Sequence, residues 1–192
     1  MTVMDEWSGM KPPANDRHWR AAMSNGQGRM HEALIEGACR YYSSQNRAHI
    51  TKIPEPFRVM KKAPTGIATV RFTAHAEPDF KGCVTGGRLI CFEAKYTDTA
   101  RINQDVVTKT QADVLERYDN LGAIAAVCVG IQQDAFMIPW AVFGNMKAYF
   151  GHKYAVADDV RVYQVKNDGV IKFLDFIDAR MRGRWEDSRR QK

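Results

Sequence analysis

The chain has 192 residues, 45% of them hydrophobic, which predicts one domain with a substantial core and appendages. Its formal net charge of +6 and isoelectric point near 9.2 favour a polyanionic partner. The four cysteines are dispersed without a Cys-x-x-Cys pair, which argues against a disulfide framework or a zinc site and indicates reduced thiols. A polar N-terminus and the lack of a membrane-length apolar run predict a cytoplasmic protein without a signal peptide or a membrane span.

The N-terminal part of the chain divides into an arm and a helix. Residues 1–27 are rich in Pro, Gly, Asn, Asp and Arg and are predicted to form a flexible basic arm, or else a solvated tail. From Gly28 to about Gln45, apolar residues recur near the 3.6-residue period, which predicts a helix. Glu32 and Glu36 lie one turn apart on its flank, where composition alone favours solvated acids.

A basic hairpin is expected after a first strand, Ala48 to Ile53. The stretch from Phe57 to Thr73 interleaves basic and apolar residues around a Pro64-Thr65-Gly66 turn, so a protruding stalk is predicted over about 54–73. Such a ribbon can enter a groove or an opening in DNA, where its cations neutralise phosphates, or it can be an ordinary hairpin on a basic protein. The candidate DNA-binding residues are Lys52, Arg58, Lys61, Lys62 and Arg71.

Two further strands carry the residues of greatest chemical interest. Asp79 to Val84 and Leu89 to Lys95 are both predicted strands, separated by Thr85-Gly86-Gly87. Because strand side chains alternate, Glu93 and Lys95 project from the same face. A three-residue loop places Asp79 directly opposite Glu93, whereas a two-residue loop would move Asp79 to the other face. We predict the three-residue register.

An acid pair with a neighbouring lysine suits the hydrolysis of a phosphodiester. Two adjacent carboxylates repel each other unless a cation lies between them, and their hard oxygens suit Mg²⁺ or Mn²⁺. A lysine beside them can stabilise the charge that develops on phosphate. The alternative is an ordinary ion pair between Glu93 and Lys95, since a bare Glu-x-Lys is common.

The downstream chain is expected to complete the core. Asn103 is a candidate N-cap for a helix to about Leu121, with Gln111 beside its buried stripe. The apolar run from Ala123 to Ile131 predicts a central strand. Residues 179–192 are predicted to form a basic C-terminal tail, which leaves 28–178 as the domain.

The order of these elements resembles a restriction-endonuclease-like core, an α/β fold whose mixed central β-sheet is flanked by helices. Pro78-Asp79 followed by Glu93-Ala-Lys95 is similar to the PD-(D/E)xK nuclease motif. More narrowly, the chain resembles the RecU-type Holliday-junction resolvases of Gram-positive bacteria and their phages. The segments that carry this resemblance are Glu32 with Tyr41-Tyr42, Lys52-Ile-Pro-Glu-Pro56, Asp79-Phe-Lys-Gly82, Phe92-Glu-Ala-Lys95, Gln111 and Met137-Ile-Pro139.

The resemblance assigns roles to individual residues. It makes Asp79 and Glu93 ligands of Mg²⁺, with Gln111 as a further metal-site residue. It makes Lys95 the group that stabilises the transition state, and Glu32 a supporting acid on the first helix. The family typically has a threonine where this chain has Glu77, so Glu77 is a further candidate metal residue, an extra carboxylate that would alter metal preference or occupancy.

The resemblance also implies an activity and partners. The implied activity is that of a Mg²⁺-dependent, structure-selective endonuclease of the nuclease domain 28–178, which resolves four-way junctions by paired symmetric nicks in recombination and repair. It implies a homodimer, branched DNA as substrate, and a recombinase or branch-migration helicase as a further partner. The alternatives are another nuclease on the same core (an exonuclease, flap or restriction-type enzyme) and a non-catalytic junction-binding modulator of recombination.

Overall fold

The computed structural model of the chain describes residues 17–54, 57–72 and 77–175. The predictions for residues 1–16 and for the tail 179–192 lie outside these ranges. Within them, no helix is long and apolar enough to span a bilayer. In chain order the elements are α1 (Arg17–Ser44), β1 (Ala48–Lys52), β2 (Phe57–Lys62), β3 (Ala68–Phe72), β4 (Phe80–Val84), β5 (Leu89–Thr97), β6 (Arg101–Asn103), the 3₁₀ helix η1 (Gln104–Val106), α2 (Lys109–Asn120), β7 (Ile124–Ile131), β8 (Asp134–Pro139), α3 (Trp140–Phe143), α4 (Met146–Phe150), β9 (Tyr154–Val156), the 3₁₀ helix η2 (Arg161–Tyr163) and β10 (Gln164–Val165).

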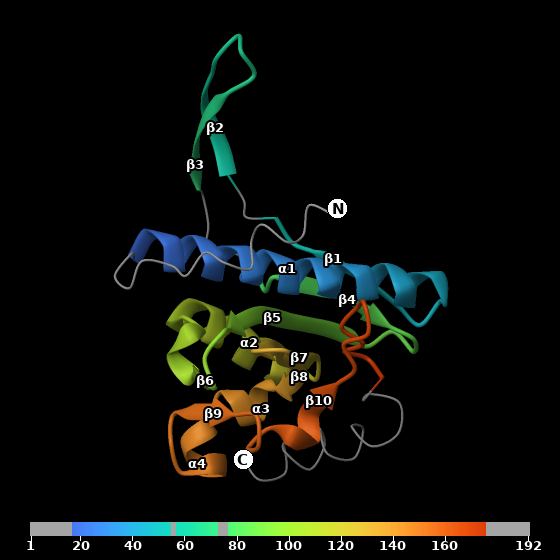
Figure 1. Cartoon of the computed structure of the whole chain (residues 1–192). Helices are drawn as coiled ribbons and strands as arrows, with labels where there is room; N and C mark the ends of the chain where they lie inside the picture. Colours follow the sequence, from blue (N-terminus) through green and yellow to red (C-terminus); the bar gives the residue numbers. More distant parts are fainter. Residues whose placement is uncertain (1–16, 55–56, 73–76, 176–192) are drawn as a thin grey trace, which may run out of the picture.

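The centre of the fold is a six-stranded sheet in the order β1-β4-β5-β7-β8-β10 (Figure 1). β5 and β7 run parallel, whereas the other neighbouring strands are antiparallel, so the sheet is mixed. All eight residues of β7 are buried, as its continuous apolar run predicts for a strand covered on both faces. The predicted α/β class, with a mixed central sheet flanked by helices, is therefore confirmed.

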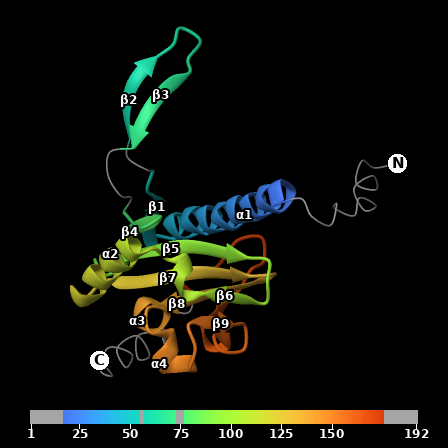
Figure 2. The same ribbon diagram turned by 90° about the vertical axis from the view of Figure 1, so that its left-hand side faces the viewer.

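Helices cover both faces of the sheet, with α1 on one side and α2, α3 and α4 on the other (Figures 1 and 2). Cys91 of β5 packs in the cluster beneath α2, which also contains Leu115. Because strand side chains alternate, Glu93 and Lys95 project toward that same face. The cluster beneath α1 receives from β5 the side chains of Ile90, Phe92 and Ala94.

The β4–β5 hairpin has the predicted three-residue loop. The Val84 N–H donates to Arg88 O at 3.0 Å, and the ladder continues from there without a shift. One more step of this register places Asp79 opposite Glu93. Two of the three loop residues, 85–87, are glycines at positive φ, a conformation that costs glycine little. The alternative two-residue loop is excluded.

β2 and β3 form a hairpin that projects from the body of the molecule (Figures 1 and 2). Its turn closes where the Gly66 N–H donates to Ala63 O at 3.1 Å, and Gly66 has a φ of +86°. Every residue of β2 is exposed. The predicted hairpin over 57–73 is confirmed, apart from Thr73, which lies outside the described residues.

A bulge at Met60 divides the side chains of this hairpin between two faces. Before the bulge, apolar side chains share one face and arginines the other, as the cross-strand pairs require. The extra residue then moves Lys61 to the arginine face, opposite Thr69. The basic face therefore holds Arg58, Lys61 and Arg71, and the apolar face holds Phe57, Val59 and Val70.

The first helix begins earlier than the sequence predicts. α1 starts at Arg17 rather than Gly28, so 17–27 of the predicted flexible arm is helical. Extending an existing helix adds one hydrogen bond for each residue fixed, and this stretch contains the strong helix formers Ala21 and Ala22. The glycines and polar residues near position 26 weaken the sequence signal without ending the helix.

The second long helix begins later than predicted. Asn103 precedes η1 and makes no side-chain cap bond. The N-cap of α2 is Thr108, whose side chain accepts the Gln111 N–H while the Gln111 side chain accepts the Thr108 N–H. This reciprocal capping box satisfies two backbone donors at the helix start, which a cap at Asn103 would leave open.

Gly82→Ala tests the close contact between β4 and β1. A Cβ at Gly82 would lie 2.0 Å from His49 O and 2.6 Å from Ile50 Cα, backbone atoms that cannot rotate away. We expect the free energy of unfolding, measured by urea denaturation, to fall by at least about 2 kcal/mol. The matched control is Gly28→Ala in α1, where a Cβ meets nothing within 4 Å. This control should be neutral or stabilise by about 0.5–1 kcal/mol, and equal losses in the two variants would contradict the packing argument.

Candidate active site

Four of the predicted site residues meet beside β5. Asp79 directly precedes β4, Glu93 and Lys95 lie on β5, and Gln111 lies in the first turn of α2. Lys95 Nζ is 3.4 Å from Glu93 Oε2, and Gln111 Nε2 donates to the same oxygen at 2.7 Å. Asp79 Oδ2 accepts the Ala94 N–H at 2.9 Å. The structure therefore joins an acid pair, a lysine and an amide in one cluster.

The start of α2 holds Gln111 in place. Its Oε1 accepts the Thr108 N–H at 3.1 Å within the capping box and lies 3.4 Å from Lys95 Nζ. Its Nε2 is left to donate to Glu93. Because both ends of the amide have partners, the side chain orients the carboxylate and the ammonium at once. This contact with Glu93 favours a positioning role for the predicted metal-site residue.

Glu93 is the most strongly perturbed group in this cluster. Its side chain is 1% exposed, and its Oε1 is buried without a hydrogen-bond partner. The pKa of Glu93 is raised to about 8, chiefly by burial and secondly by the nearby charge of Asp79, while the ammonium of Lys95 acts to lower it. A buried carboxylate oxygen without a donor is costly unless another group satisfies it.

Asp79 and Glu93 fit a divalent cation. The unpartnered Glu93 Oε1 offers a hard oxygen ligand, and a cation beside it would relieve the repulsion between the two acids. In the part of the chain that the structure describes, no group of three or more His, Cys, Asp or Glu side chains could hold a metal. A cation held by two carboxylates keeps positions for water and substrate, as Mg²⁺ sites commonly do.

Two predicted functional residues lie apart from this cluster. Glu32 belongs to α1, on the other face of the sheet, and its Oε2 accepts a hydrogen bond from Lys52 Nζ at 2.6 Å. Lys52 also lies 3.6 Å from Glu36. The carboxylate predicted to support catalysis and the lysine predicted to bind DNA are thus paired with each other.

Glu77 lies next to the cluster with partners of its own. Its Oε2 accepts hydrogen bonds from Lys81 Nζ at 3.1 Å and from the Tyr118 hydroxyl at 2.9 Å. Sequence reasoning assigned no function to Lys81 or Tyr118. Two signals were available, because Lys81 is two residues after Asp79 on one strand face and Tyr118 is two helical turns after Gln111.

The remaining candidates for DNA binding lie on the hairpin. All four are exposed, and no ion pair joins them to another residue that the structure describes. Exposed cations on a protruding element are available to neutralise phosphates. These residues are Arg58, Lys61, Lys62 and Arg71.

The raised pKa of Glu93 predicts how stability changes with pH in the absence of metal. The folded chain holds a proton on Glu93 up to about pH 8, whereas the unfolded carboxyl releases it near 4.5. The resulting stabilisation is therefore complete below pH 4.5 and is lost as the pH rises to about 8. Urea denaturation in a chelator should show the wild type losing up to about 1.4 kcal/mol per pH unit relative to Glu93→Gln. Parallel curves for the two proteins would contradict the assigned pKa.

The chain was compared with solved structures, curated proteins and protein-family models. Among solved structures, the chain is similar to Hjc, a Holliday junction resolvase from Archaeoglobus fulgidus, with 9% identity and a TM-score of 0.41 over 68% of this chain and 92% of that chain. None of the curated proteins matches the sequence. The family model RecU, described as Recombination protein U, matches residues 26–179, which include the whole cluster and the hairpin. The chain therefore belongs to the RecU family of recombination proteins.

Proposed function

We propose that the protein is a divalent-metal-dependent endonuclease that resolves four-way DNA junctions by paired nicks. The observation that carries this proposal is the buried Glu93 opposite Asp79, with one carboxylate oxygen left without a partner. A structural ion pair has no need for an open buried oxygen, whereas a metal site does. Membership of the RecU family and the exposed basic hairpin support DNA as the substrate.

The cation expected at this site is Mg²⁺, with Mn²⁺ as an alternative. Asp79 and Glu93 would hold it, and Gln111 would keep Glu93 in place through its 2.7 Å hydrogen bond. When bound, such a cation supplies Lewis acidity to the attacked phosphodiester and promotes deprotonation of a nearby water.

Lys95 has the position of a group that stabilises the transition state. As water attacks phosphorus and the bond to the leaving oxygen breaks, negative charge grows on the phosphate oxygens. The side chain of Lys95 is 21% exposed, so its ammonium can reach a bound substrate. Its contacts with Glu93 and Gln111 restrict the position of that ammonium. A compact ammonium can approach one phosphate oxygen closely, which the planar guanidinium of arginine cannot reproduce.

A homodimer would supply the two sites that paired nicks require. A four-way junction has twofold symmetry, and a C₂ dimer places two identical sites about one axis. We expect the enzyme to act in the cytoplasm on branched DNA, with a recombinase or branch-migration helicase as a further partner. Glu32 would then act indirectly, through its ion pair with Lys52, rather than by contact with the substrate.

Another nuclease activity on the same fold is the main alternative. The protruding hairpin favours a branched substrate, because a projecting ribbon matches an opening better than a continuous duplex. Incubating synthetic four-way junctions and linear duplexes of equal length with the protein and Mg²⁺ separates the two activities. Paired nicks in the junction with little loss of the duplex support the proposal, whereas comparable digestion of both would favour an exonuclease or restriction-type enzyme.

Asp79→Asn should separate cleavage from binding. Loss of one carboxylate removes a ligand of the proposed cation, so the cleavage rate should fall at least about a hundredfold, or 2.7 kcal/mol. Junction affinity should stay the same or rise, because less negative charge then faces the phosphates. Asp113→Asn is a matched control, since Asp113 is an exposed aspartate of α2 that pairs with Lys109. Parallel loss of binding and cleavage in Asp79→Asn would contradict the assignment.

Shortening the hairpin tests its role in recognising junctions. Val59 and Val70 are cross-strand partners, so an Asn-Gly turn can join them in place of 60–69 without changing the register below. Affinity for a four-way junction should fall at least about tenfold more than affinity for linear duplex, a difference of 1.4 kcal/mol. The control is Lys61→Gln with Lys62→Gln, which removes the same charge and keeps the length. Equal losses on both DNAs would show that the hairpin is only a basic surface.

A further inference from the structure

Lys81, Tyr118 and Glu77 form a closed triangle of hydrogen bonds. Lys81 Nζ donates to the Tyr118 hydroxyl at 2.5 Å and to Glu77 Oε2 at 3.1 Å. The Tyr118 hydroxyl donates in turn to the same Glu77 oxygen at 2.9 Å. The ammonium also lies 4.8 Å from the centre of the Tyr118 ring. Two donors therefore converge on one carboxylate oxygen.

This triangle lies next to the candidate active site and on the same face of the sheet. Lys81 follows Asp79 by two residues and pairs with Cys91, which precedes Glu93 by two residues. Positions two apart on a strand are separated by about 6.6 Å. Along the axis of a DNA helix each strand carries one phosphate per about 3.4 Å, so a strand that places one phosphate at the acid pair has another, one or two nucleotides away, within reach of Lys81.

The Glu77 carboxylate fills the position of an anion in this arrangement. An ammonium and a hydroxyl that point at one oxygen are the donors that a phosphate oxygen also accepts. The site is open to solvent, since the side chain of Glu77 is 51% exposed and that of Lys81 is 30% exposed. An ion pair this exposed contributes at most about 1 kcal/mol, so another anion can displace the carboxylate at little cost.

We propose that Lys81 and Tyr118 bind a DNA phosphate beside the one that is cleaved, and that Glu77 occupies this position until DNA displaces it. The identity of the ligand rests on the proposed function. The site itself rests on the three hydrogen bonds. Glu77 is then a competing internal anion, which distinguishes its role from that of a metal ligand.

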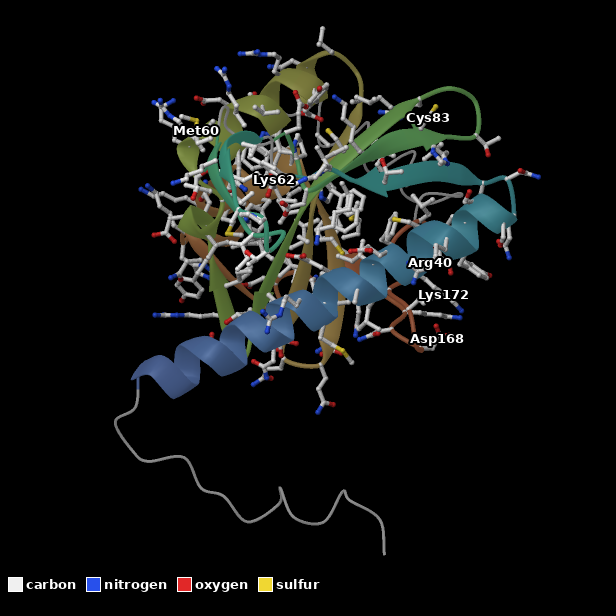
Figure 3. The ribbon with its side chains drawn as sticks, turned by 90° about the horizontal axis from the view of Figure 1, so that it is seen from above. Arg40, Met60, Lys62, Cys83, Asp168 and Lys172 are labelled. Atoms are coloured by element: carbon white, nitrogen blue, oxygen red, sulfur yellow. The ribbon has the colours of Figure 1, made fainter. Side chains whose placement is uncertain are left out.

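The chain contains a matched control on the opposite face. Lys172 pairs with Asp168 at 2.9 Å with side-chain exposures of 23% and 54%, and its ammonium lies 5.7 Å from the centre of the Tyr41 ring. Figure 3 shows Lys172 and Asp168 close to α1, which covers the face away from the acid pair. This second lysine, acid and tyrosine have similar chemistry and lie far from the proposed cleavage site.

The test measures junction binding in a chelator, where no cleavage occurs. Fluorescence anisotropy with a labelled four-way junction gives affinity and its dependence on salt. Lys81→Met should lower affinity and reduce the salt slope by about 1. The loss of junction affinity caused by Lys81→Met should be at least about threefold larger in a Glu77→Gln background than in the wild type. In that background Lys81 does not have to break an ion pair with Glu77 before it binds a phosphate. Tyr118→Phe, which leaves the charge unchanged, should weaken binding about threefold or more.

The control variants separate a phosphate site from a general effect of surface charge, and the Mg²⁺ dependence separates it from a metal-ligand role of Glu77. Lys172→Met, Asp168→Asn and Tyr41→Phe should leave junction affinity within about twofold of wild type. Additive effects of Lys81→Met and Glu77→Gln, or an unchanged affinity in Tyr118→Phe, would overturn the proposal. A Glu77→Gln variant that needs more Mg²⁺ for cleavage yet binds the junction unchanged in chelator would also overturn it, and would assign Glu77 to the metal.

Failure of this inference is distinguishable from failure of the proposed function. Binding in chelator does not depend on catalysis, so the expected couplings without any metal-dependent cleavage would reject the nuclease and retain the phosphate site. If the wild type makes paired nicks in junctions but the Lys81 and Tyr118 variants bind junctions as tightly as the wild type does, the nuclease is retained and the phosphate site is rejected.

Discussion

The pairing register between β4 and β5 is the constraint on which the site depends. One residue of slip would turn Asp79 away from Glu93 and toward α1. Two features at opposite ends of the ladder hold the register. The Thr85 hydroxyl donates to Arg47 O at 2.9 Å and anchors the loop, while on the α1 face the rings of Phe80 and Phe92 stack with their centres 5.1 Å apart. Packing on the apolar face of the hairpin thus fixes the positions of Asp79 and Glu93 on its opposite face.

The helix that covers the acid pair is tied to it at its first turn. Gln111 completes the capping box of α2 with Thr108 and contacts both Glu93 and Lys95. A residue in this position links the stability of the helix start to the geometry of the site. The cost of burying Glu93 is only partly offset by these contacts, because its Oε1 stays without a donor. The proposed cation, bound at this oxygen, would offset more of that cost.

Local chemistry made much of this arrangement predictable. Alternation along β5 and the glycine-rich loop left two registers open, and we predicted the one that pairs Asp79 with Glu93. Contacts that depend on where a distant element packs were not accessible in this way. Asn103 and Thr108 are both residue types that cap helices. Thr108 is the N-cap of α2 because it exchanges hydrogen bonds with Gln111, which Asn103 does not. The meeting of Lys81 with Tyr118, 37 residues apart, requires the position of α2 on the sheet.

The attachment of the hairpin connects DNA binding with the candidate site. β2 and β3 are inserted between β1 and β4, which are neighbours in the sheet and end at the pair Lys52 and Phe80. Just beyond that pair, the Ile53 N–H donates to Asp79 O at 2.8 Å. The exposed cations therefore project from the same strand ends that carry the aspartate of the acid pair. Since negative carboxylates repel phosphates, the proposed binding of DNA needs attraction from elsewhere on the chain, and the exposed cations of the hairpin would supply it.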